Sequence, residues 1–514
     1  SFLKDAKRGG VADTMKPLLL KIAPILLSLL GGVLIALAFP PWNFGGLIWI
    51  GFTPVLAGLL LFPRRWVFSL IQGAIFGGTF GGMVFSWLWV GGRPSDWFSN
   101  TASLALLGAI WGIFLDLFVH LPVGNGDRRV APILPGYGFN AAAWSKSLAH
   151  LRTAFLAAAA WTVLEWTRGV LLPEWNAVGT VLQDNLPLLQ ISTITGVSGL
   201  TFIIVFANLI VLAAVRRIIL EPGRMTWASR FDVTATLGVI FLIGVAGFWW
   251  LQRGPSGDRK NIGLICPSTV EFSRLLELSQ QESGMGINLF VWRCARFGPG
   301  DYTRLSDALI GKTAGLASGT TSTDDGALSG TTIFIPGAVR NILLIPNRRD
   351  FFQPGIGPIG RSLNPFNFAD TSWATFINWE AGDPRLIRAA VIKQVQALVA
   401  FVDTFPGGRG GVEQLFANLR LWSVSFGRPM IFASTKDLAG IVTRSGKIVA
   451  GARVGSSSDA MTGAIEVSAP LDSTPYGRYG DWFAVACGAA CLVTAISERL
   501  RLYQEKAGHT FSRK

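Results

Sequence analysis

Long apolar segments alternate with short polar loops in this chain, and the pattern predicts membrane-spanning helices. A helix needs about 20 apolar residues to cross the roughly 30 Å hydrocarbon layer of a bilayer. Eight segments approach that length, near residues 17–38, 45–62, 66–92, 102–122, 152–173, 195–216, 232–252 and 481–498. They predict an N-terminal membrane part (1–252), a polar domain (253–480), and an eighth span with its tail (481–514).

Charged and small residues occur inside some of these spans. Glu165 and Arg168 lie one turn apart in the fifth span, so we expect an ion pair on one helix face, with a functional role as the alternative. Glycines recur through the third span, among them Gly73 and Gly77, and such small residues predict close helix packing.

Within the polar domain, short apolar runs alternate with segments of helical spacing, which predicts a layered α/β domain. Strands are expected at 261–266, 287–292, 331–335, 342–345, 373–378 and 429–433. Helices are expected at 272–284, 385–403 and 411–426, and a hairpin turning at Ser445 and Gly446. Residues 316–330 are poor in apolar side chains and predict a mobile loop. The Pro- and Gly-rich segment 123–151 predicts a solvated loop, or alternatively a docking surface for a partner.

The composition agrees with a membrane protein. Of the 514 residues, 50% are hydrophobic and only 15% are charged, whereas a soluble domain carries about a quarter charged residues. Four cysteines are too few for a disulfide scaffold. The three histidines, His120, His150 and His509, are scattered, so neither a metal site nor a cofactor is expected.

Basic residues explain both the net charge of +14 and the orientation. Because they gather in alternate loops beside the spans, the positive-inside rule places both termini in the cytoplasm and residues 253–480 outside. We therefore expect a multi-pass protein of the bacterial cytoplasmic (inner) membrane that contacts lipids and binds no nucleic acid. The basic start leads into an apolar run too long for a cleaved signal, which predicts a retained first span. These basic residues are Lys4, Lys7, Arg8, Lys16, Arg64, Arg65, Arg128, Arg129, Lys146, Arg216, Arg217, Arg224, Arg230, Arg499, Arg501, Lys506, Arg513 and Lys514.

Several motifs occur in the order in which one known family carries them. They are ALAFPPW (36–42), WTVLEWTRG (161–169), GVSGLTFIIVFANL (196–209), GRPMIFAS (427–434), GIVTRSGKIV (440–449) and TPYGRYGDWF (474–483). Through them the chain resembles the apolipoprotein N-acyltransferase family over nearly its whole length. The resemblance implies about eight spans and a nitrilase-like αββα domain between spans 7 and 8.

The resemblance also implies where the reactive residues belong. Such enzymes are understood to pass an acyl chain from a phospholipid through a Cys thiolate to the amine of a lipoprotein, with a Glu base and a Lys that stabilises the oxyanion. Here Cys294 stands at the position of the Glu. Arg349, or less closely Arg348, stands at that of the Lys. Asn378 stands at that of the Cys, and the neighbouring Glu380 is retained.

These replacements remove the chemistry. An Asn amide has no thiolate form, and Arg does not shuttle protons near pH 7. We therefore expect a non-catalytic relative that acts as a structural or accessory subunit of a membrane complex, or that binds a lipid or lipoprotein. The alternatives are a rewired acyltransferase, with Cys294 as nucleophile and Glu380 as base, or another residue supplying the chemistry. Cys266 lies inside a predicted strand, where a buried apolar role is expected.

Overall fold

The computed structural model describes residues 22–511, and the placements reported below refer to these. The segments outside the description within that range are 63–64, 120–137, 172–175, 221–226, 253–256, 268–270, 296–299, 302, 306–313, 322–327, 336–341, 347–364, 403–408, 435–437 and 453–458.

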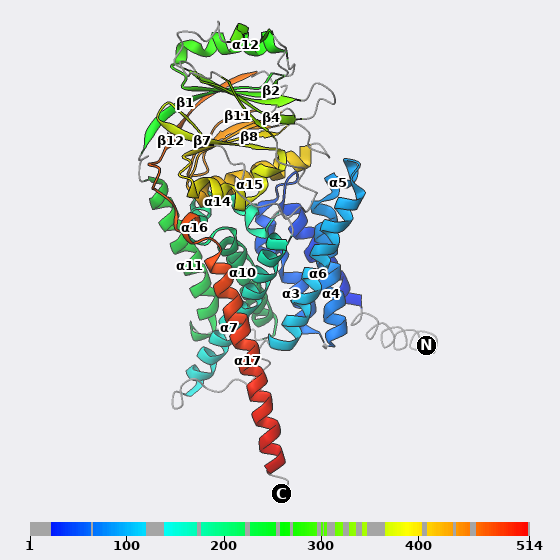
Figure 1. Cartoon of the computed structure of the whole chain (residues 1–514). Coiled ribbons are helices and arrows are strands. Elements are labelled where there is room, and N and C mark those ends of the chain that lie inside the picture. The colour runs from blue at the N-terminus through cyan, green and yellow to red at the C-terminus, as the bar shows by residue number, and fades with distance from the viewer. Residues whose placement is uncertain are drawn as a thin grey trace, which may run out of the picture.

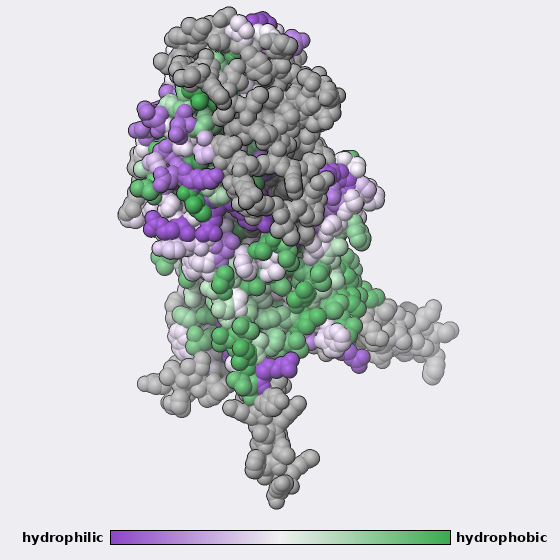
Figure 2. Space-filling view, in the orientation of Figure 1, coloured by the Kyte–Doolittle hydropathy of each residue, from purple (hydrophilic) through white to green (hydrophobic). Residues whose placement is uncertain are grey.

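A bundle of apolar helices forms the membrane unit, and Figure 2 shows it as a hydrophobic band below a more hydrophilic domain. Six of the described helices are long and apolar enough to cross a bilayer, whereas the first two predicted spans form shorter apolar helices, Ile22–Ala38 and Gly45–Leu61. The chain is thus a helical membrane protein, with eight an approximate count of its spans. The labelled helices are α2 (Ile48–Gly51), α3 (Thr53–Leu61), α4 (Trp66–Val84), α5 (Ser86–Val90), α6 (Pro94–Phe118), α7 (Gly138–Leu171), α10 (Val197–Leu220), α11 (Trp227–Gln252) and α17 (Trp482–Phe511). Short 3-10 and α turns join them: η1 (Gly45–Leu47), η2 (Val178–Asp184), α8 (Leu186–Leu189), α9 (Ser192–Thr195) and α16 (Pro475–Tyr479).

Glycines bring α4 and α6 into backbone contact. A Cβ added at Gly73 would overlap the carbonyl of Gly108, and one added at Gly77 would overlap that of Leu104. The predicted role of these glycines in close packing is therefore confirmed.

The loop predicted over 123–151 is wrong in its second half, because α7 begins at Gly138. Alanine, Leu and Lys dominate residues 141–151, and these are strong helix formers. Pro and Gly are concentrated before Gly138, in the part that lies outside the described residues.

Two six-stranded sheets packed face to face form the domain above the bundle (Figure 1). The first sheet has the order β12-β1-β2-β3-β4-β5, and the second β11-β10-β9-β8-β7-β6. Apolar residues of both sheets, such as Val291 and Val399, form the core between them. The strands of the first sheet are β1 (Asp258–Ile265), β2 (Leu289–Ala295), β3 (Gly315–Thr321), β4 (Leu328–Phe334), β5 (Ile342–Pro346) and β12 (Ala460–Val467). Those of the second are β6 (Phe366–Phe368), β7 (Thr371–Ile377), β8 (Ala397–Val402), β9 (Met430–Ser434), β10 (Ala439–Val442) and β11 (Ile448–Ala452).

Helices cover the outer face of each sheet. Helix α12 (Phe272–Glu282) packs its apolar residues on the first sheet, together with the 3-10 turn η3 (Ser283–Met285) that follows it. Helices α14 (Pro384–Ile392) and α15 (Arg409–Phe426) lie between the second sheet and the membrane helices (Figure 1). The domain therefore has the αββα layers that the resemblance predicts, and the nitrilase-like fold class is confirmed.

Two predictions of local structure within the domain are wrong. Residues 385–403 are not one helix, because α14 ends at Ile392 and the fully buried strand β8 follows. A short continuous apolar run such as ALVAFV does not distinguish a buried helix from a central strand by its periodicity. Residues 316–330 are not a loop throughout, since β3 and the start of β4 lie there. The small residues of β3 allow close packing: a Cβ at Gly315 would lie 2.7 Å from the Phe368 ring.

A buried glutamine ties the domain to the membrane unit. Gln414 of α15 donates hydrogen bonds to the carbonyls of Pro40 (2.8 Å) and Val84 (2.9 Å). Its Oε1 accepts from Trp87 Nε1 (2.8 Å) and Asn176 Nδ2 (2.6 Å). All four hydrogen-bonding positions of this amide are thus used, and its partners lie far away in the sequence.

The packing between domain and bundle is continuous. One hydrophobic cluster contains Phe52 and Trp161 of the membrane helices and also Leu415 and Trp422 of α15. At its margin, Arg420 forms an ion pair with Asp184 of η2. The second sheet and its helices are therefore held in one orientation above the bundle.

Candidate functional site

The carboxyl ends of parallel strands from both sheets meet at one edge of the domain. Strands β1 and β2 run parallel in the first sheet, as do β7, β8 and β9 in the second. Cys266, directly after β1, is hydrogen-bonded to the backbone of Arg293 in β2 and of Ser434 at the end of β9. The register pairs Ile377 with Phe401, so β7 ends at the same edge. We call this place the carboxyl edge.

The predicted site residues follow these strand ends. Cys294 lies in β2, and Asn378 opens the 3-10 turn η4 (Asn378–Gly382) directly after β7. The backbone therefore brings the strand positions of Cys294 and Asn378 to one edge, as the resemblance implies. Arg348 and Arg349 lie outside the described residues.

Glu380 folds back onto the strand that precedes it. The side chain is buried, and its Oε2 accepts a hydrogen bond from the Ile377 amide at 3.1 Å. A carboxylate in the first turn of a 3-10 turn satisfies backbone N–H groups that the turn itself leaves unbonded. Glu380 thus fixes the end of β7, which is a structural use of the retained acid.

Cys266 is held as a neutral thiol. Only 2% of the residue is exposed, and burial raises the pKa of the thiol to about 12, although the Arg293 charge and two backbone hydrogen bonds act in the opposite direction. The expectation of a small buried apolar residue is confirmed. Among the side chains that the structure describes in the domain, Cys266 is the only cysteine.

Arg293 is a residue that the sequence reasoning missed. It is 5% exposed, and its Nη1 donates a hydrogen bond to the carbonyl of Pro267. Ser318 Oγ donates to the Arg293 carbonyl at 3.2 Å. The register of β2 against β3 shifts between Trp292 and Ala295, and at this irregularity the Arg293 side chain is buried within the domain. The available signal was a lone charge ending the apolar run at 287–292.

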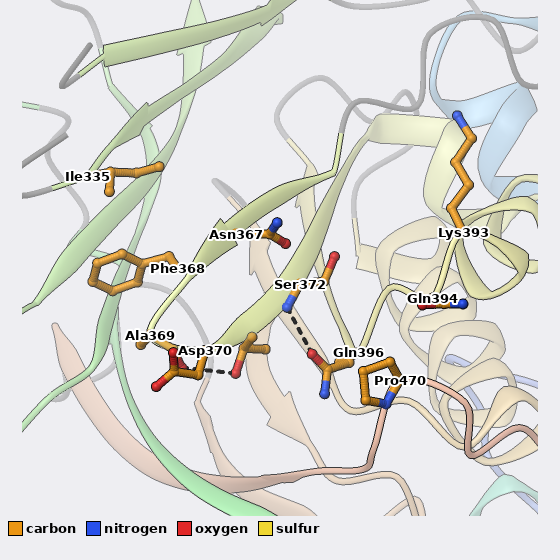
Figure 3. Close-up of a pocket in the computed structure, with 11 residues that line it drawn as sticks. Ile335, Asn367, Phe368, Ala369, Asp370, Ser372, Lys393, Gln394, Gln396 and Pro470 are labelled. Carbon is orange, nitrogen blue, oxygen red and sulfur yellow. Dashed lines mark hydrogen bonds between the residues drawn. The ribbon is translucent and has the colours of Figure 1, made fainter. Parts of the chain in front are cut away.

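A pocket of about 700 Å³ opens at the other edge of the second sheet (Figure 3). Its residues surround the amino end of β7, near Thr371, whereas Asn378 follows the carboxyl end of that strand. This pocket is therefore separate from the position of Asn378. It is lined by Ile335, Asn367, Phe368, Ala369, Asp370, Thr371, Ser372, Lys393, Gln394, Gln396 and Pro470.

The two charged residues of the fifth predicted span hold different neighbours. Glu165 accepts hydrogen bonds from the Val178 amide (2.9 Å) and the Thr201 hydroxyl (2.6 Å), and so anchors η2. Arg168 donates to Ser103 Oγ (3.0 Å) and Asn100 Oδ1 (3.1 Å) of α6. Both side chains thus fix the outer ends of the helices, which favours the structural interpretation.

No group of three or more His, Cys, Asp or Glu side chains suited to a metal ion occurs within the described part of the chain.

Comparison with known proteins supports the family resemblance over the membrane unit. Residues 31–210 match the family described as the apolipoprotein N-acyltransferase N-terminal domain. An apolipoprotein N-acyltransferase of Geobacter metallireducens is 28% identical over 199 residues, which cover 37% of this chain and 33% of the relative. That of Rhodopseudomonas palustris is 27% identical over 354 residues, covering 63% and 59%. The predicted resemblance is thereby confirmed, although the chain spans only about a third to three fifths of the length of these relatives.

Solved structures with partial similarity to the chain include an amidase from the nitrilase superfamily and a carbon-nitrogen hydrolase. A mutant Nesterenkonia amidase of that superfamily is 12% identical, with a TM-score of 0.33, over 44% of this chain and 95% of the amidase. A carbon-nitrogen hydrolase from Helicobacter pylori is 14% identical, with a TM-score of 0.31, over 40% and 89%.

Proposed function

We propose that this apolipoprotein N-acyltransferase-like membrane protein is a non-catalytic relative of the acyltransferases. In this role it serves as a structural or accessory subunit of a membrane complex, or binds a lipid or lipoprotein without acylating it. Its setting is the bacterial cytoplasmic membrane, with both termini in the cytoplasm and the nitrilase-like domain on the opposite side.

The observation that carries the proposal is the residue after β7. Asn378 stands there, at the carboxyl edge, and Glu380 is engaged with the Ile377 amide. Acyl transfer through a thioester needs a sulfur nucleophile, which an amide side chain does not provide. Replacing one member of such a constellation typically lowers rates by orders of magnitude.

Cys266 is a poor substitute for that nucleophile. With a pKa of about 12, on the order of one molecule in 10⁵ carries the thiolate at pH 7. The thiol also belongs to the apolar core between the sheets, where burial disfavours the charged thiolate.

The retained body supports a structural role. Gln414 places four hydrogen bonds in the interface between domain and bundle, all with buried partners. Fully satisfied buried polar networks specify one arrangement of the parts they join. A scaffold needs such a fixed arrangement even when no reaction takes place on it.

The second candidate function is a rewired acyltransferase with Cys294 as nucleophile. The observation that favours it is the position of Cys294, which lies in β2 at the carboxyl edge directly after the buried cation Arg293.

An acyl-transfer assay separates the two candidates. Purified full-length protein in nanodiscs is incubated with acyl-labelled phospholipid and a diacylated lipopeptide. Our proposal predicts neither a labelled thioester on the protein nor a triacylated peptide. A hydroxylamine-sensitive label that disappears in Cys294→Ser, but not in Cys266→Ser, would establish the rewired enzyme instead.

A further inference from the structure

The guanidinium of Arg293 is a buried cation for which the described residues provide little compensation. Only 5% of the residue is exposed, and Nη1 is satisfied by the Pro267 carbonyl. Its Nε is buried and has no hydrogen-bond partner within the described part of the chain. The ion pairs among those residues do not include Arg293 either.

The surroundings of this cation are apolar. Cys266, which neighbours Arg293, belongs to the apolar core between the sheets, and so does Val291 of the same strand. Moving a charge from water into such surroundings is unfavourable, and one carbonyl hydrogen bond offsets only a part of the penalty. An anion in contact with the guanidinium would supply the missing attraction.

The chemistry of the site selects the kind of anion. A guanidinium offers parallel N–H groups that match the two oxygens of a carboxylate, and the unbonded Nε–H belongs to one such pair. One positive charge neutralises one negative charge. A phosphate dianion would leave a second charge unpaired in these apolar surroundings, so a monovalent carboxylate fits better.

We propose that the carboxyl edge binds a monovalent carboxylate, anchored by Arg293 between the ends of β1, β2 and β9. This inference rests on the proposed function, because it assigns a reversible ligand to a site that no longer performs acyl transfer. Arg293 thus gives the domain a binding role in the place where the resemblance implies a covalent one.

Thermal unfolding of the full chain in phosphatidylcholine nanodiscs tests the proposal. The wild type is titrated with sodium acetate, sodium octanoate or sodium phosphate at constant ionic strength and at about pH 8, where phosphate is mainly the dianion. We expect a saturable rise in Tm with a carboxylate and none with phosphate. Acetate alone would indicate a bare carboxylate, and a much lower half-saturating concentration for octanoate would indicate a fatty acid.

Two substitutions of matched chemistry locate the site. Arg293→Met should abolish the carboxylate response, while Arg259→Met, at an exposed position of β1 in the same sheet, should retain it. Without carboxylate, Arg293→Met should unfold at or above the wild-type temperature, because it no longer buries an uncompensated charge. Arg293→Lys keeps the charge but lacks the paired N–H groups of a guanidinium. We therefore expect a half-saturating carboxylate concentration at least about tenfold higher than that of the wild type.

Several outcomes would overturn the inference. These are a wild type that does not respond to carboxylates, a response to phosphate alone, and an Arg293→Met protein that responds like the wild type. A large fall in Tm of Arg293→Met without ligand would identify a structural ion pair instead. If that variant does not fold, the wild-type titration and Arg293→Lys still decide. The Tm titration measures reversible binding, whereas the acyl-transfer assay measures a covalent product. A negative titration would therefore reject the carboxylate site without rejecting the proposed function.

Discussion

Trp87 Nε1 and Gln414 Oε1 share a hydrogen bond of 2.8 Å, although 327 residues separate them in the chain. The bond joins α5 at the outer end of the membrane unit to α15 of the domain, which lie next to each other in Figure 1. Because Gln414 also binds Pro40, Val84 and Asn176, this one amide joins four residues of the membrane unit to the domain.

Replacing Gln414 by Leu should destabilise the protein strongly. The change leaves two carbonyls, an indole N–H and an amide without their partner, and each unsatisfied buried group costs about 1–3 kcal/mol. We expect a loss of at least about 3 kcal/mol, measured by thermal or denaturant unfolding in detergent. The control is Gln281→Leu on the exposed face of α12, which should change stability by less than about 0.5 kcal/mol. Equal effects of the two substitutions would contradict the proposed role of Gln414.

An alanine at Gly77 should separate α4 from α6. Its Cβ would overlap the backbone carbonyl of Leu104, so the helices must shift, and overpacking of this kind costs about 1–3 kcal/mol. The matched control is Gly238→Ala in α11, where an added Cβ meets nothing within 4 Å. There the gain in helix propensity should leave stability unchanged or raised by up to about 1 kcal/mol. Comparison of the two Tm values is the measurement, and a neutral Gly77→Ala would refute the close contact.

The buried thiol of Cys266 predicts a loss of stability at alkaline pH. Its pKa is about 12 in the folded protein against 9.0 for an ordinary thiol, so the unfolded chain loses this proton first. The stabilisation is therefore complete below about pH 9 and declines as the pH rises from 9 towards 12, with a limiting slope of about 1.4 kcal/mol per pH unit. Cys266→Val should reduce this slope in unfolding curves measured across that range. Identical slopes in both proteins would show that the thiol does not titrate as inferred.

Restoring the thiol alone should not restore acyl transfer. Asn378→Cys places a sulfur after β7, but Cys294 still stands where the resemblance implies a base. We expect the same product as empty nanodiscs give in the labelled-phospholipid assay. Turnover by this single variant would show that the rest of the catalytic site is intact, and that only one residue separates the protein from an enzyme.

The proposed orientation predicts which positions a membrane-impermeant maleimide labels. In a cysteine-free background, Asp472→Cys in the exposed segment before α16 should react in bacterial cells with a permeable outer membrane. Arg499→Cys, exposed at the far end of the apolar part of α17 (Trp482–Leu500), should react only after the cytoplasmic membrane is opened. The reverse pattern would invert the topology, since α17 crosses between the two positions.

Much of the architecture was predictable because apolar runs report burial directly. Strands β1, β2, β7 and β9 were expected at nearly their observed positions, and so were α12 and α15. The pattern of apolar residues failed to predict strands whose residues are all buried and strands whose side chains are small. Strand β8 is buried along its whole length and therefore shows no alternation of apolar and polar residues. Six of the seven residues of β3 are Gly, Ala, Ser or Thr.

The candidate site was predictable in position but not in content. The resemblance located Cys294, Asn378 and Glu380 at strand ends that the fold brings to one edge. The resemblance did not predict that Arg293 is buried. A charged residue at the end of a strand points into the core or to solvent depending on how that strand pairs. The use of Glu380 as a cap for Ile377 likewise depends on backbone geometry that no motif encodes.

One hydrophobic cluster runs from Trp161 in the bundle to Trp422 in α15. The membrane unit and the domain must therefore change together in evolution. A globular half cut free at its linkers would present the underside of α15 to water and aggregate. A chimera carrying the globular half of another relative would have to match that surface residue for residue. Substitutions beneath α15 are therefore constrained by the sequence of the bundle.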